Sequence, residues 1–432
     1  MKTLSSALAT LVILLPSLLS RADDWPQYRG SKLDGISKEP VLRVWPAGGL
    51  TQSWRTPLSD GFSSFSTGGG KAFTLVARTI DGVLRDTVVA LNGETGKELW
   101  AYPIAPSKYD GGGNDGTQDN RGGDGPRSTP AYSDGHVYAL SGGLQLVCVH
   151  AESGRLVWTR DLIMQHAGKN ISWQNAASPV MDGDLIFVAG GGPGQALLAI
   201  HKKSGQPAWQ GQDDRMTHAT PAVATILGQK QVIFFTQSGL VSLDTKSGTL
   251  LWRHKFPYNV STAAAPVVSG NIVYCSAGYG VGSSAAQITK TGTAWTATEL
   301  WRLTGNKICN HWSTPEALNG YLYGMFSFKE YGKGSVKCVE LATGAEKWAQ
   351  PGFGPGNVTL VDGHLLALSD SGELVLVKPE PSGYKELARM KAVQGKCWST
   401  PVVSNGRVLV RSTKEGAAFV ITPKTAAISL KP

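Results

Sequence analysis

Hydrophobic residues in this chain gather in short runs that are separated by turn residues. A typical run has about five residues, follows a Gly and is rich in β-branched and aromatic side chains. Clear examples occupy 135–140, 183–188, 270–274, 320–323 and 406–410. Short runs of this composition between Gly-containing turns predict β-strands. The pattern therefore predicts an all-β protein.

The runs belong to a repeat that ends in a tail of Thr or Ser, Gly, three variable residues and Trp. Successive closing Trp residues are 46, 58, 51, 43, 49 and 47 residues apart. Two of them close units without the Gly, and an eighth unit near Arg389 lacks the Trp. We expect these Trp to be structural, each packing over the next unit with its indole N–H on a backbone acceptor. The seven are Trp54, Trp100, Trp158, Trp209, Trp252, Trp301 and Trp348.

Most units open with two small residues and a Pro, as in Ser128-Thr129-Pro130. Each unit then holds three to four short strands in about 45 residues, which is typical of a propeller blade. The last unit starts at Ser399 and has about three strands, whereas the first Trp-ended strand, 50–54, has no strands before it. The sequence thus predicts an eight-bladed β-propeller of four-stranded antiparallel blades over 50–425. The N-terminal strand completes the last blade and removes an open sheet edge.

The two ends of the chain lie outside this propeller. Lys2, an apolar stretch and the small residues before position 23 predict a secretory signal peptide over 1–22. Residues 23–49 form a lead-in segment and 426–432 a C-terminal tail. The sequence has no Cys near the cleavage site, so we expect no lipid anchor there. The protein is expected in the periplasm or the medium.

Composition and charge narrow the possible partners. Gly makes up 53 of 432 residues and charged side chains only 17%, as expected for many turns between buried strands. The formal net charge is +9, but no run of Lys and Arg marks a nucleic-acid groove. No stretch after the signal has the 18 apolar residues of a membrane span. We expect a monomer that does not bind nucleic acid and does not cross a membrane.

Five scattered Cys allow no complete set of disulfides. Cys148 and Cys338 each precede a tail Gly by six residues, so they occupy the same place in two repeats. We expect them to be small core residues. The pairing of the five is left open by the sequence.

The tails, together with Trp25-Pro26-Gln27-Tyr28-Arg29-Gly30, resemble the pyrroloquinoline-quinone-type repeat β-propellers. This family includes quinone-dependent alcohol dehydrogenases and the outer-membrane-assembly lipoprotein propeller. The resemblance covers essentially all of 25–425. It implies the propeller fold and leaves the activity open, because one fold serves many functions.

The dehydrogenases of that family carry adjacent Cys residues and an acidic calcium site, and neither can be matched in this sequence. A haem-attachment C-x-x-C-H motif is also absent. We therefore expect a non-catalytic binding or scaffold module for an envelope protein, peptide or carbohydrate, with no cofactor. The alternative is an alcohol or sugar dehydrogenase that uses pyrroloquinoline quinone with calcium. A third reading, a sugar lyase or hydrolase, would need two facing carboxylates that the sequence cannot reveal.

The residue three before each opening Pro is expected to recur around one mouth of the central channel. Aromatic rings, Arg and His that converge there would suit an aromatic or anionic ligand. The same side chains could instead simply plug the channel. The candidates are Phe65, Arg127, Trp173, Asn175, Ala176, His218, Ala263, Asn310, His311, Trp312 and Trp398.

A Gly-rich insertion over 109–127 leads directly into the opening at Ser128. Its closely spaced oxygen donors could hold calcium, with Asp110, Asp115, Asp119 and Asp124 as the acidic ligands. The spacing does not fit an EF-hand loop. A long functional loop overhanging the channel mouth is the other interpretation.

Overall fold

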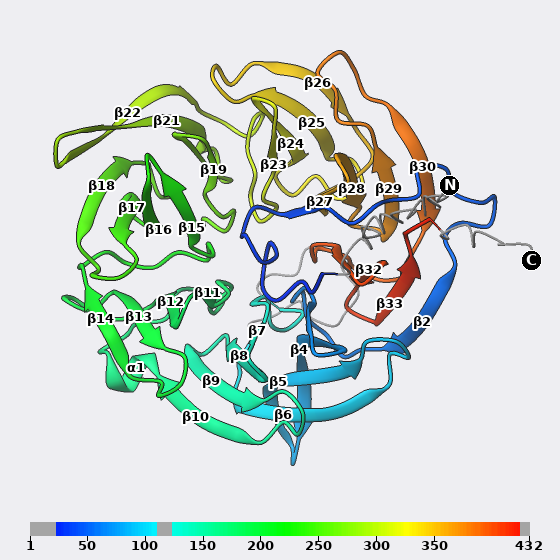
Figure 1. The fold of residues 1–432 in the computed structure, drawn as a ribbon, viewed down its shortest axis with the longest axis horizontal. Coiled ribbons are helices and arrows are strands. Elements are labelled where there is room, and N and C mark those ends of the chain that lie inside the picture. Colours follow the sequence, from blue (N-terminus) through cyan, green and yellow to red (C-terminus); the bar gives the residue numbers. More distant parts are fainter. Residues whose placement is uncertain (1–22, 110–122, 424–432) are drawn as a thin grey trace, which may run out of the picture.

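The computed structural model describes residues 23–109 and 123–423. Eight β-sheets stand radially around one central axis, and each follows the previous one around the ring (Figure 1). The helical structure in the described residues is one short helix, α1 (Leu162–Gln165). This architecture confirms the predicted eight-bladed propeller of four-stranded antiparallel blades.

Each blade runs from an innermost strand at the axis to an outermost strand at the perimeter. Blade 1 consists of β3 (Ser66–Gly68), β4 (Lys71–Ile80), β5 (Val83–Asn92) and β6 (Glu98–Pro106). Blade 2 consists of β7 (Ala131–Ser133), β8 (His136–Leu140), β9 (Gln145–His150) and β10 (Leu156–Asp161). Blade 3 consists of β11 (Val180–Asp182), β12 (Leu185–Ala189), β13 (Leu197–His201) and β14 (Pro207–Gly211). Blade 4 consists of β15 (Ala222–Ile226), β16 (Gln229–Thr236), β17 (Gly239–Asp244) and β18 (Leu250–Lys255).

Blade 5 consists of β19 (Val267–Ser269), β20 (Ile272–Ala277), β21 (Gly282–Thr291) and β22 (Ala294–Leu303). Blade 6 consists of β23 (Glu316–Leu318), β24 (Tyr321–Phe326), β25 (Ser335–Glu340) and β26 (Glu346–Gln350). Blade 7 consists of β27 (Asn357–Val361), β28 (His364–Leu368), β29 (Glu373–Val377) and β30 (Glu386–Lys391). Blade 8 contributes β31 (Val402–Ser404), β32 (Arg407–Arg411) and β33 (Glu415–Val420).

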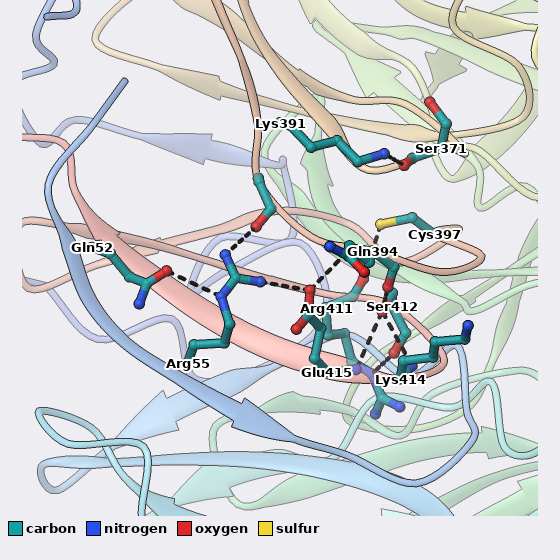
Figure 2. Close-up of polar contacts among 11 residues, drawn as sticks. Gln52, Arg55, Ser371, Lys391, Gln394, Cys397, Arg411, Ser412, Lys414 and Glu415 are labelled. Atoms are coloured by element: carbon teal, nitrogen blue, oxygen red, sulfur yellow. Dashed lines mark hydrogen bonds and ion pairs between the residues drawn. The ribbon is translucent and has the colours of Figure 1, made fainter. Parts of the chain in front are cut away.

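Blade 8 takes its outermost strand from the other end of the chain. β2 (Gln52–Pro57) pairs antiparallel with β33, with Trp54 opposite Ala418. Figure 2 shows polar contacts along this closure, where Arg55 donates to Glu415 at 2.5 Å. The predicted completion of the last blade by the N-terminal strand is therefore confirmed.

Polar contacts also join blade 8 to blade 1. Arg411 of β32 is fully buried, and it donates to Thr74 Oγ1 at 2.7 Å and to the carbonyl of Leu75 at 2.8 Å, both in β4. Burial lowers the pKa of Arg411 to about 10. The first and last blades are thus joined by hydrogen bonds between their strands as well as by β2, which completes blade 8.

The lead-in segment contains structure that the sequence did not predict. β1 (Ile36–Ser37) adds a fifth strand to blade 7, parallel to β27. Before β1, the chain runs over the middle of the ring, dark blue in Figure 1. Trp25 and Thr67 are joined by two hydrogen bonds, and the Gln27 amide bonds to Met181 of β11. Arg29 forms a buried, two-pronged ion pair with Glu316 of β23, at 3.0 and 2.9 Å.

The tail motif has a steric reason. Gly154 has φ +68°, and a Cβ built on it would lie 2.7 Å from the indole of Trp100 in the preceding blade. The tail Gly of blade 1 meets Trp54 in the same way. A side chain at this turn would displace the preceding blade's Trp, so Gly and Trp recur together.

Six of the closing Trp donate their indole N–H to a carbonyl of the following blade, at 2.8–3.0 Å. Trp252 differs, because it donates to the side chain of Gln231 within its own blade, at 2.6 Å. The unit that follows Trp252 is the one that ends at Trp301 without a tail Gly. The exception therefore falls where the motif itself is incomplete.

The core lies between neighbouring blades, whose apolar faces cover one another. Cys148 and Cys338 are members of two such clusters. All five Cys lie in the described residues, and all are buried and free.

Candidate functional site

The opening motifs form a belt around the axis. In five blades, the backbone N–H at the position before the opening Pro, or before Phe65 in blade 1, donates to a hydroxyl of the next blade. The pairs are Ser64 to Thr129 (3.0 Å), Thr129 to Ser178 (2.9 Å), Ser178 to Thr220 (3.0 Å), Ala265 to Thr314 (3.0 Å) and Thr400 to Ser64 (2.8 Å). We call these five hydroxyl residues, Ser64, Thr129, Ser178, Thr220 and Thr314, together with Thr400, the hydroxyl belt.

A cavity of about 160 Å³ lies on the axis at this belt. The lead-in segment contacts residues that follow an opening Pro in the sequence, such as Glu316. The rim residues instead precede the opening Pro, so they lie toward the other end of the channel. The segment therefore lies at the far end of the channel, where Tyr28 lines the cavity. The axial cavity is a cup with its mouth at the start of the innermost strands, and we call it the axial cup.

The structure brings most of the candidate mouth residues together around the axial cup. They are Arg127, Trp173, Ala176, His218, Ala263, His311, Trp312 and Trp398. Their common position before the opening Pro, or next to it, explains why they converge, because each innermost strand starts at the same height.

Phe65 does not line the axial cup. The turn at Gly69 and Gly70 sets the register of β3, and Phe65 therefore stands where the other units have their opening Pro. We had expected Phe65 to stand three residues before that position. Phe65 is buried and packs edge-on against Trp54, with ring centroids 6.2 Å apart. Phe62 takes the rim position instead.

Asn175 and Asn310 are also absent from the lining, since both hold backbone in place. Asn175 exchanges hydrogen bonds with the backbone of Ala177, each 3.0 Å long. Asn310 accepts from the Tyr274 hydroxyl at 2.7 Å and donates to the carbonyl of Met325 at 2.8 Å. Both side chains are buried among these partners.

Aromatic rings form a collar around the mouth. Phe62 stacks on Trp398 with centroids 4.5 Å apart, and Trp398 stacks on Trp312, also at 4.5 Å. His311 contacts Trp312 at 4.7 Å and the ring of Tyr279 at 5.2 Å. The collar continues to Trp173, whose ring is parallel to Tyr279 within 10°.

Several lining residues were missed in the sequence. Tyr279 and Lys329 lie in the loops between β20 and β21 and between β24 and β25, which carry no repeat motif. Asn357 lies in a blade whose opening lacks the small-small-Pro pattern, and Tyr28 belongs to the lead-in. The one available signal was the recurrence of Ser or Thr before most of the opening Pro residues, which marks the hydroxyl belt.

The basic group at the rim is fixed in position. Arg127 donates to the carbonyls of Trp173 at 2.6 Å and Gly123 at 3.1 Å. Burial lowers the pKa of Arg127 from its ordinary value. Behind it, Tyr109 donates to Asp86 at 2.6 Å, and burial raises the pKa of that carboxyl.

The two His of the cup are neutral near pH 7. Burial lowers the pKa of His218 to about 4 and that of His311 to about 3. His218 Nε2 lies 2.8 Å from the carbonyl of Ser172, and Nδ1 lies 3.0 Å from Ser261 Oγ. Both ring nitrogens of His218 are engaged, so we assign it a positioning role.

The side chains present do not fit quinone chemistry that requires calcium. No Asp or Glu lines the axial cup among the described residues, and no group of three or more His, Cys, Asp or Glu in them could hold a metal. Asp124 is buried and ion-paired with Lys396. Asp110, Asp115 and Asp119 lie outside the described residues. Within 23–109 and 123–423, no helix is long and apolar enough to cross a membrane.

Comparison with known proteins places this propeller. The family model described as outer membrane protein assembly factor BamB matches residues 84–308 and 332–427. BamB from Burkholderia pseudomallei is 25% identical over 214 residues, 48% of each chain. BamB from Yersinia pestis is 21% identical over 243 residues, 53% of this chain and 56% of its own. The chain thus spans about half the length of the curated relatives it matches.

Solved structures share the fold. BamB from Moraxella catarrhalis aligns with a TM-score of 0.57 and 17% identity, covering 86% of this chain and all of its own. A quinohemoprotein alcohol dehydrogenase from Comamonas testosteroni aligns with a TM-score of 0.62 and 12% identity, covering 93% and 82%. At these identities the likeness concerns the fold alone. The family match spans most of the propeller, so the chain belongs to the repeat-propeller family described as outer membrane protein assembly factor BamB.

Proposed function

We propose that this protein is an exported, non-catalytic binding propeller of the cell envelope that holds another envelope protein. The observation that carries the proposal is the family match over residues 84–308 and 332–427. The relatives at 25% and 21% identity are named outer membrane protein assembly factors, which supports a partner in outer-membrane assembly. A monomer in the periplasm or the medium, cut after residue 22, agrees with this role.

The chemistry of the axial cup supports binding over catalysis. Acid–base work on a sugar or an alcohol needs a carboxylate or a titrating His near the substrate. The described lining residues include no carboxylate, and the pKa values of His218 and His311 are far below 7. Rigid aromatic rings and fixed donors are typical of recognition sites.

The protein partner can be tested by cross-linking in the organism that makes the protein. A photoreactive residue at Met164 of α1, which is 81% exposed, would report contacts of the mouth-side loops, and one at Val44, 82% exposed, those of the lead-in. We expect cross-links to outer-membrane assembly proteins from one of these sites and a fall in folded outer-membrane proteins when the gene is deleted. Unchanged outer-membrane proteins and no such cross-link would refute the role in assembly.

The quinone alternative is checked with the same purified protein. Pyrroloquinoline quinone is titrated with and without calcium in a thermal-shift assay, followed by a dye-linked alcohol assay. We expect no calcium-dependent rise in Tm and no dye reduction. A calcium-dependent rise with turnover would make the protein an oxidoreductase.

A further inference from the structure

We propose that the axial cup binds one acidic pyranose ring, a sugar that carries a carboxylate, at the end of a glycan chain. The inference rests on the proposed binding function and names the ligand of its axial site. Shape, wall chemistry, floor chemistry and charge each support it separately.

The shape follows from two alanines. Large side chains fill the rim position in blades 1, 2, 4, 6 and 8, whereas Ala176 and Ala263 stand there in blades 3 and 5. The large side chains are Phe62, Arg127, His218, Trp312 and Trp398. The missing side chains leave the cavity of about 160 Å³. A cavity of roughly 150 Å³ holds one benzene ring in other proteins, so this cup accommodates a single six-membered ring.

The walls are rigid aromatic rings that hold one another in place. Trp312 is fixed by an indole hydrogen bond of 2.9 Å to the carbonyl of Pro355, and Trp398 is packed between Phe62 and Trp312. Trp173 and Tyr279 face the same cavity from the other side of the collar. Large rings with few rotatable bonds offer contact area to an apolar ligand surface at little entropic cost.

The floor offers hydrogen-bond donors. In each belt contact the hydroxyl oxygen of Thr129, Ser178 or Thr220 accepts a backbone N–H, so its own O–H proton remains to be donated. Trp398 is 7% exposed, and its indole N–H has no partner among the described residues. An unpartnered buried donor costs free energy unless a ligand or water satisfies it. An oxygen-rich ligand would satisfy these donors.

The charge of the lining favours an acidic sugar over a neutral one. Arg127 and Lys329 line the cup, and no carboxylate does so within the described residues. The His of the cup add no negative charge. A ligand carboxylate near Arg127 would gain a charge-assisted hydrogen bond in a partly dry site. A peptide end would bring N–H donors of its own to a floor that already donates, so we favour the sugar.

The test measures calorimetric binding of oligosaccharides that end in glucuronic or galacturonic acid. The same oligosaccharides with a neutral terminal sugar, and a peptide with a C-terminal aromatic residue, serve as comparison ligands. We expect binding of the acidic sugars and at least tenfold weaker binding of the neutral ones. Equal binding of neutral and acidic sugars, preference for the peptide, or no sugar binding would overturn the inference.

Variants of the cup make the test specific. Ala263→Phe fills the cavity without removing a contact, so it should abolish sugar binding while Tm is kept or raised. Trp173→Ala should weaken binding tenfold or more, whereas Trp295→Ala on the outer hairpin β21–β22 should bind as wild type. Undiminished binding by folded Ala263→Phe protein would place the sugar elsewhere. If the wild-type protein binds none of these sugars but still cross-links to assembly proteins, this inference fails and the proposed function stands.

Discussion

The indole of each closing Trp and the Gly of the next tail form the smallest unit of this fold. Trp100 lies over Gly154, and its N–H reaches the carbonyl of Ala151 at 2.9 Å. Two properties of the Gly are used at once, since it permits a positive φ and leaves room for the ring. Other glycines at hairpin turns use only the first property.

This difference can be measured with a matched pair. Gly154 and Gly135 have φ of +68° and +74°, but a Cβ at Gly135 would meet nothing within 4 Å. Gly135→Ala should cost about 1 kcal/mol of unfolding free energy for the strained backbone alone. Gly154→Ala should cost about 2 kcal/mol more, because Trp100 must also move. Denaturant unfolding of the two variants decides it, and equal losses would contradict the steric account.

Buried His side chains make stability depend on pH. The unfolded chain takes up a proton at His218 near pH 6.5, whereas the folded protein does so only near pH 4. Below pH 6.5 the unfolded state therefore binds more protons, and stability falls as pH decreases toward 4. His311, with a folded pKa of about 3, adds to the same trend.

We expect His218→Gln to flatten this profile by about 3 kcal/mol between pH 6.5 and pH 4, from the size of its pKa shift. Chemical unfolding at several pH values measures the slope for the variant and the wild type. Stability above pH 7 should show no such pH dependence from this residue. An identical slope in both proteins would mean that His218 titrates normally.

At the scale of elements, the strand content and the number of blades could be predicted because the same sequence repeat recurs along the whole propeller. Wherever the repeat was complete, as at Trp312 and Trp398, the rim position also followed from the sequence. The register failed at Phe65, because the first unit replaces the opening Pro with a Phe and only the turn at Gly70 sets the strand. Tyr28 and Tyr279 could not be predicted as lining residues, since they reach the axis through non-repeated segments whose course depends on tertiary contacts.

The lead-in segment shows how such a course is fixed. Arg29 and Glu316 are 6% and 1% exposed, and burial raises the pKa of Glu316 to about 7 even beside the guanidinium. Arg29→Met should cost about 3–5 kcal/mol, because Glu316 stays buried without its partner. The double variant Arg29→Met with Glu316→Met should recover much of that loss. Thermal and denaturant unfolding test this pair, and simple addition of the two single losses would contradict the coupling.

At the scale of the whole molecule, the ring depends on one exchanged strand. Without β2, the edge of β33 would expose unpaired backbone groups that invite pairing with another chain. Removing residues 23–57 should therefore give a protein that aggregates or forms larger assemblies in light scattering. Adding a synthetic peptide of residues 50–58 should restore monomers, and a stable, monomeric truncated chain would contradict the role of β2.

The strand exchange between β2 and β33 also sets an order of events during biosynthesis. β2 precedes all eight innermost strands in the sequence, whereas its partner β33 is the last strand of the described residues. A partly synthesised or partly translocated chain can stack its early blades, but it cannot become a closed ring. Every shortened product therefore keeps an exposed strand edge on which quality-control proteases and chaperones can act. The finished protein loses that edge only when its last strand arrives.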